Sequence, residues 1–87
     1  MSVIDMMRER LATLEPTELT VIDDSALHAG HLGARSGGGH YRLNIVSSRF
    51  TGCNTMQKHR LVYDALGSLM KREIHALSIN AFPPDES

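Results

Sequence analysis

The chain has 87 residues, of which 41% are hydrophobic and 22% charged, and its formal net charge is −1. These proportions predict one folded domain and exclude a disordered chain. No apolar run approaches the ~20 residues that span a bilayer, and the single cysteine excludes an internal disulfide. We expect one domain over residues 1–82, a short acidic tail over 83–87, no membrane association and a reducing, cytoplasmic location.

Charge is distributed unevenly along the chain. Residues 1–34 hold two basic residues and six acids, whereas residues 35–72 hold seven basic residues and one acid, Asp64. This asymmetry is compatible with a basic face that meets an anionic partner, or simply with a solvated helix surface.

The first third of the chain predicts a helix followed by a strand. Ser2 is a suitable N-cap, and apolar residues then recur at steps of three and four. Pro16 disfavours helical geometry in the preceding residue, so the helix should stop near Leu14. Residues 19–23 (LTVID) alternate and are rich in β-branched side chains, which predicts a strand. A glycine-rich segment follows.

Three further elements are expected after this segment. Residues 41–47 predict a second strand, with Tyr41, Leu43 and Ile45 on one face. After a turn in which Gly52 is suited to a left-handed conformation, Asn54 and Gln57 resemble a capping box that opens a helix running to about residue 71.

The last predicted element is a third strand over residues 74–80, on which His75, Leu77 and Ile79 share one face. Pro83 and Pro84 should end regular structure.

The element order therefore reads helix–strand–strand–helix–strand. Sequential strands pair antiparallel, and a helix between two strands suits a right-handed parallel crossover. We predict an α+β fold, α-β-β-α-β, in which both helices cover one face of a three-stranded mixed sheet.

Histidines are the residues that stand out chemically. His28 and His31 form an H-x-x-H pattern in the glycine-rich segment. Both rings could bind one metal ion, or both could be exposed to solvent without a binding role. His75 replaces a β-branched residue on an apolar strand, which fits either a hydrogen-bonded structural imidazole or a ligand. Signatures of nucleophilic catalysis, of a phosphate-binding loop and of a zinc protease helix are missing, so we do not expect an enzyme.

The chain resembles the BolA family over nearly its whole length. The resemblance is carried by "DDSALHAGH", "HYRLNIVSSRFTGCNTMQKHRLVYDAL" and "IHALSI". The residues that match the family pattern are His40–Tyr41, Val46–Ser47, Phe50, Gly52, His59–Arg60, Val62, Leu66 and His75–Ala76–Leu77. Lys58 stands where the family favours Arg, which keeps the charge but loses the planar guanidinium.

The resemblance implies a fold similar to class II KH domains and a partnership with monothiol glutaredoxins. In that role a [2Fe–2S] cluster is shared within a heterodimer, for iron and redox homeostasis and for cluster trafficking. The family uses the His of H-A-L, here His75, and a residue of the loop after the first strand, here His28 or, alternatively, His31. Glutaredoxin and glutathione would supply the remaining cluster ligands, so we expect the isolated chain to hold no cofactor. We expect the isolated chain to be a monomer or a weak homodimer.

The resemblance also implies an alternative, a DNA-binding transcriptional regulator of stress response and cell morphology. The candidate phosphate contacts are Lys58, His59, Arg60, Lys71, Arg72 and Arg49. Against this role, the G-x-x-G loop of nucleic-acid-binding KH domains is missing, because "CNT" follows Gly52.

Overall fold

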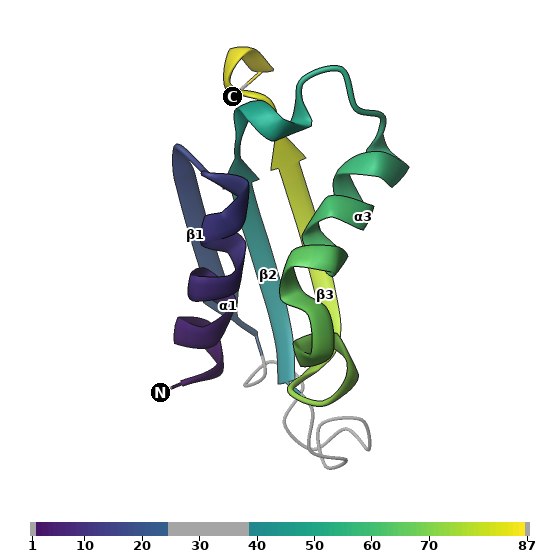
Figure 1. Cartoon of the computed structure of the whole chain (residues 1–87). Helices are drawn as coiled ribbons and strands as arrows, with labels where there is room; N and C mark the ends of the chain where they lie inside the picture. Colours follow the sequence, from purple (N-terminus) through teal and green to yellow (C-terminus); the bar gives the residue numbers. More distant parts are fainter. Residues whose placement is uncertain (1, 25–38, 87) are drawn as a thin grey trace.

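The computed structural model describes residues 2–24 and 39–86 (Figure 1). Its main elements are α1 (Val3–Leu11), β1 (Glu18–Asp23), β2 (Gly39–Val46), α3 (Thr55–Leu66) and β3 (Ile74–Phe82). Short 3₁₀ helices cover Ala12–Leu14, Ser48–Phe50, Gly67–Lys71 and Pro84–Glu86, the last of them where the sequence predicted no regular structure. None of the helices in these ranges has the length and apolar character needed to cross a membrane.

The sheet has the order β1-β2-β3, with β1 antiparallel and β3 parallel to the central β2. Figure 1 shows α1 and α3 side by side on one face of this sheet. The predicted α+β architecture is therefore confirmed, including the parallel crossover through α3.

Both helices begin at capping boxes that the sequence encodes. The Ser2 hydroxyl accepts from the backbone N–H of Asp5 at 3.1 Å. At α3, the Asn54 side chain accepts from the N–H of Gln57 at 2.8 Å, and the Gln57 side chain accepts from the N–H of Asn54 at 2.9 Å. These bonds satisfy N–H groups that have no partner within the helix.

The helix ends are also explained locally. The first helical segment stops at Leu14 as predicted, and Glu15, before Pro16, takes a left-handed φ of 51°. The second helix was predicted to run to about residue 71. Instead the α-helix ends at Leu66, because Gly67 has a positive φ of 56°, and a 3₁₀ helix completes the segment.

The core lies between the helices and one face of the sheet. Tyr41, Leu43 and Ile45 of β2 are buried there, as predicted. The other large buried side chains are Met7, Leu11, Leu14, Phe50, Val62, Leu66, Leu69 and Ile74. Among the residues that the structure describes, no helix lies over the opposite face of the sheet (Figure 1). This face is called the open face below.

The prediction that His75 shares a face with Leu77 and Ile79 is wrong. Gly39 pairs with Ile74 but His40 pairs with Ala76, so β3 has one extra residue, His75, at this point. Such a β-bulge breaks the alternation of side chains. Ile74 and Leu77 consequently both face the helices, while the His75 side chain is exposed.

Ser47 joins three parts of the fold just after β2. Its side chain is fully buried, and its hydroxyl donates to the carbonyl of Leu14 at the end of the first helical segment. The same oxygen accepts from the N–H of Arg49 at 3.1 Å. The Ser47 N–H donates to the carbonyl of Phe82 at 3.0 Å. The hydroxyl therefore satisfies backbone groups from two separate segments.

We expect Ser47→Ala to lower the free energy of unfolding by roughly 1–3 kcal/mol, because it leaves a buried carbonyl without its donor. Urea unfolding followed by circular dichroism measures this change. Ser48→Ala, at the exposed neighbouring position, should shift stability by less than about 0.5 kcal/mol. Equal midpoints for the two variants would contradict this role of the hydroxyl.

Candidate functional site

Two histidines meet where the parallel strands β2 and β3 begin. The ring centroids of His40 and His75 are 5.2 Å apart and their planes are inclined by 49°. His40 alternates with the buried Tyr41 and so lies on the open face, where the bulge also places His75. His75 is exposed, so the pair is accessible through this ring, whereas His40 is half-buried and its Nε2 atom is shielded from solvent.

Asp24, the residue after β1, forms hydrogen bonds with β2 beside the histidine pair. The backbone N–H of Asp24 donates to the carbonyl of His40 at 2.8 Å. The Asp24 carboxylate accepts from Nη2 and Nε of Arg42, at 2.9 and 3.0 Å. Beside these groups is a hollow of about 270 Å³ lined by Asp24, His40, Tyr41, Ala76, Leu77 and Ser78. The pair therefore borders a small concave surface on ordered strands.

The Tyr41 ring lies under this surface, and its position requires a glycine at residue 39. A Cβ atom at Gly39 would lie 2.5 Å from the Tyr41 ring, so the buried ring occupies the space that any side chain at that position would need. Burial raises the pKa of the Tyr41 hydroxyl above 10.0, and the negative charge of Asp23 raises it further.

The two predicted loop ligands, His28 and His31, lie outside the described residues. Residues 25–38 connect Asp24, after β1, to Gly39, the first residue of β2. Both ends of that segment therefore lie at the end of the sheet that carries His40 and His75. His40 was not among the sequence-predicted ligands, and it precedes the predicted strand of residues 41–47. The predicted parallel pairing of this strand with the "HAL" strand was the available signal, because it brings the starts of both strands to one end of the sheet; in the structure His40 pairs with Ala76, next to His75.

The two imidazoles of His40 and His75 could supply only part of the ligands of an iron–sulfur cluster. Residues 2–24 and 39–86 hold no group of three or more His, Cys, Asp or Glu residues arranged for a metal ion. Two imidazoles can serve one iron of a [2Fe–2S] cluster, whose other iron then takes two thiolates. Cys53, the single cysteine, lies between the first residues of α3 and the Ser48–Phe50 turn, and its Sγ is 3.6 Å from the Arg49 carbonyl. Any thiolates would have to come from another molecule.

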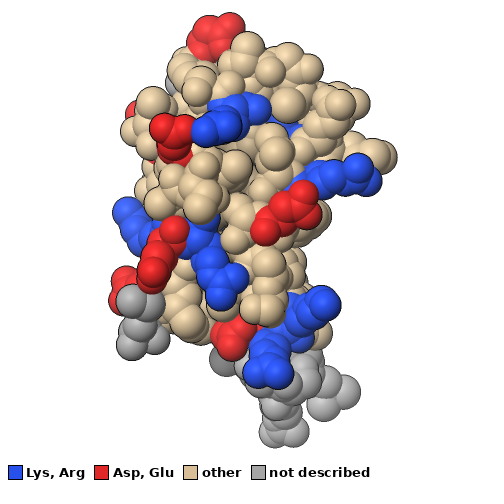
Figure 2. All heavy atoms as spheres, viewed as in Figure 1, with Lys and Arg blue, Asp and Glu red and all other residues tan. Residues whose placement is uncertain are grey.

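The predicted basic residues are spread over the molecule. Lys58, His59 and Arg60 belong to α3, whereas Lys71 and Arg72 follow its far end. Arg49 is engaged in an ion pair with Glu15. Figure 2 shows positive and negative side chains interspersed on the helix-covered face. The uneven charge of the sequence therefore does not become one continuous basic patch on this face.

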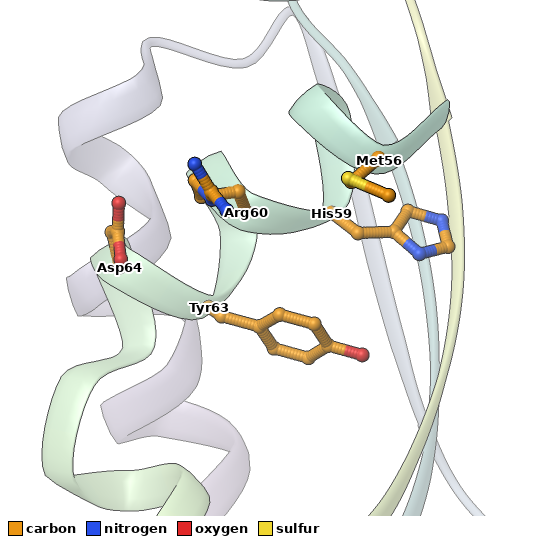
Figure 3. Close-up of a pocket in the computed structure, with 5 residues that line it drawn as sticks. All are labelled: Met56, His59, Arg60, Tyr63 and Asp64. Atoms are coloured by element: carbon orange, nitrogen blue, oxygen red, sulfur yellow. The ribbon is translucent and has the colours of Figure 1, made fainter. Parts of the chain in front are cut away.

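A second hollow, of about 470 Å³, lies on the outer side of α3 (Figure 3). Met56, His59, Arg60, Tyr63 and Asp64 line it. The rings of His59 and Tyr63 meet edge to face, with centroids 6.4 Å apart. His59 is half-buried.

Fold and site together define a small α+β domain with an accessible histidine pair and without a recognisable catalytic constellation in the part described. The family model for "BolA-like protein" matches residues 11–86. The chain belongs to the BolA-like family, as its sequence motifs indicated.

Relatives and solved structures agree with this assignment. BOLA1, chloroplastic, of Arabidopsis thaliana is 44% identical over 93% of this chain and 53% of the relative. The "DNA-binding transcriptional regulator BolA" of Escherichia coli is 33% identical over 88% of this chain and 75% of the relative. The structure of A. thaliana BolA1 superposes with a TM-score of 0.84 at 39% identity, covering 100% of this chain and 98% of that one.

The domain also occurs inside larger proteins. The BolA domain of SufE1 from A. thaliana has a TM-score of 0.79 at 44% identity, covering 93% of this chain and 91% of that domain. The chain spans only 23% of SufE-like protein 1 and about half of BOLA1.

Tyr41 provides a test of the packing beneath the site. Because its folded-state pKa is raised, the stabilisation by the neutral hydroxyl is complete below pH 10 and is lost as the pH rises through the folded-state value. We expect the free energy of unfolding to fall above pH 10 more steeply in the wild type than in Tyr41→Phe. Urea unfolding between pH 8 and 11 measures the difference, and parallel pH profiles would contradict it.

Proposed function

We propose that this protein is an adaptor, not an enzyme, that binds a monothiol glutaredoxin and shares a [2Fe–2S] cluster with it. Its role is iron and redox homeostasis and cluster trafficking in a reducing compartment, the cytoplasm. The observation that carries this proposal is the accessible pair His40–His75, with its ring centroids 5.2 Å apart. A purely structural histidine would be expected to be buried and satisfied, whereas His75 is exposed.

His75 is the first proposed ligand. The second is His28 or His31, which belong to the segment joined at both ends to this part of the sheet, and the contact with His75 adds His40 as a third candidate. A glutaredoxin cysteine and glutathione supply the sulfur ligands. When bound, the cluster supplies transferable iron and sulfide and a one-electron redox centre.

The chain itself contributes position and protonation state. The ion pair of Asp24 with Arg42 and the backbone bond from Asp24 to His40 hold the strand ends in place. Coordination requires a neutral imidazole, so acid should release the cluster. Because its own donors are incomplete, the chain should bind no cluster without the glutaredoxin.

Reconstitution with a monothiol glutaredoxin, glutathione, iron and sulfide tests the proposal. The mixed complex should show visible absorption and circular dichroism that differ from those of the glutaredoxin alone. His75→Ala should abolish most of that difference, because the cluster loses a direct ligand. His59→Ala, which removes a half-buried imidazole from α3, should leave the spectrum unchanged.

An unchanged spectrum of the His75→Ala complex would show that this ligand assignment is wrong. Alanine substitution of His28, His31 and His40, one at a time, identifies the second ligand by the same spectra. Sedimentation of each mixture separates loss of the cluster from loss of the heterodimer.

A second candidate, DNA binding, is favoured by the similarity to the DNA-binding transcriptional regulator BolA of E. coli. The cations on α3, Lys58 and Arg60, would contact phosphates in this case. The interspersed charges of Figure 2 favour a small contact rather than an extended one.

We expect any such binding to weaken steeply with salt, since each phosphate contact contributes roughly −0.9 to the slope of log K against log salt. Gel shifts with a duplex at rising salt measure this slope. The double variant Lys58→Ala, Arg60→Ala should reduce it by about two, and Arg8→Ala on α1 should not. Equal slopes for wild type and double variant would exclude the α3 contact.

A further inference from the structure

Within residues 2–24 and 39–86, no strand pairs with the outer side of β3. Strand β3 is one outer strand in the order β1-β2-β3, and its nine residues, 74–82, include no charged side chain and no proline. The other outer strand, β1, has six residues and carries acids at both ends, Glu18 and Asp23. Charges, prolines and shortness are the usual protections of an edge strand against pairing. Apart from the bulge at His75, β3 lacks them.

The backbone groups that face this edge can be assigned. The carbonyl of Phe82 accepts from the N–H of Ser47, so Phe82 directs its backbone groups toward the β2 side. Successive residues of a strand direct these groups to opposite sides. Leu77, Ile79 and Ala81 therefore present theirs to the free edge, and Leu77 and Ile79 are only half-buried.

The hollow is lined by α3 residues alone, and α3 itself contacts β3. Figure 3 shows His59 and Tyr63 projecting from α3 toward the side where β3 runs, and Figure 1 shows α3 packed along β3. Met56 is 72% exposed and Tyr63 42%, although both are large and apolar. An edge strand beside a helix is a surface at which an extended peptide can add as a strand and place alternate side chains in pockets.

Charge indicates what kind of peptide fits. The ion pairs of the described residues are Arg42–Asp24 and Arg49–Glu15, so the exposed Arg60 at the hollow is not engaged in one. The hollow is lined by one cation, Arg60, and one acid, Asp64, and Lys58, outside the hollow, makes α3 as a whole net positive. A carboxylate on the incoming segment would complement Arg60. A second copy of β3 would bring no carboxylate, because this strand is uncharged.

We propose that the β3 edge and the α3 hollow form one groove that binds an extended, acidic segment of a partner protein. The segment adds as a fourth strand beside β3, bonded to the outward backbone groups of Leu77 and Ile79. One apolar side chain of the segment enters the hollow of Met56 and Tyr63, and a nearby carboxylate pairs with Arg60. This groove does not require the cluster or His75.

A displayed library of random twelve-residue peptides, panned against the whole chain, tests the proposal. The enriched peptides should combine an acidic residue with alternating apolar residues. In hydrogen exchange followed by NMR, a bound peptide should slow the amides of Leu77 and Ile79 at least ten-fold. Methylation of alternate backbone nitrogens of the peptide should abolish binding without any change to the protein.

Charge reversal at one position provides the matched control. Arg60→Glu should weaken peptide binding at least ten-fold, whereas Arg72→Glu, an equal reversal at an exposed site beyond α3, should leave it unchanged. Peptide binding should also survive His75→Ala, which separates this groove from the proposed cluster site.

Three results would overturn the proposal. The first is a library without enriched peptides, and the second is enriched peptides that leave the Leu77 and Ile79 amides unprotected. The third is slower exchange of those amides at higher protein concentration without any peptide. This result would show that the β3 edge pairs with a second copy of the chain.

Discussion

The parallel pairing of β2 with β3, with one extra residue in β3, is the constraint on which the candidate sites depend. Parallel pairing brings the start of each strand to the same end of the sheet, so His40 and the H-A-L segment become neighbours. The bulge then turns His75 to the open face while Ile74 remains in the core. Without the extra residue, strict alternation would place His75 on the helix-covered face with Leu77, where it could not act as an accessible ligand.

Much of this fold follows from local sequence rules, because its caps and apolar periods agree with one another. Asn54 and Gln57 form the predicted capping box, and the faces of β2 were correctly assigned from alternation. The orientation of His75 could not be predicted from alternation, because a bulge is decided by how two strands pair rather than by either strand alone. The contact of His40 with His75 is likewise a consequence of tertiary pairing, and the basic residues, clustered in sequence, are spread over the structure.

The two candidate binding surfaces use different sides of the same strand. The histidine pair occupies the open face at the start of β3, whereas the proposed peptide groove uses its outer edge and the neighbouring α3 surface. In the proposed adaptor role, this arrangement would let one partner be held through metal ligands and another through backbone hydrogen bonds.

The same parallel pairing has a consequence for how the chain folds. Val46 pairs with Phe82, 36 positions further along the chain, whereas the β1–β2 pairs, from Asp23–Tyr41 to Glu18–Val46, are 18 to 28 positions apart. Loop closure over such a distance costs entropy before the contacts form, so β3 should be the last strand to join the sheet. Until it does, an uncharged strand is free to pair with other chains. The rate of β3 docking, more than final stability, should therefore govern how much of the protein is lost to aggregation during folding.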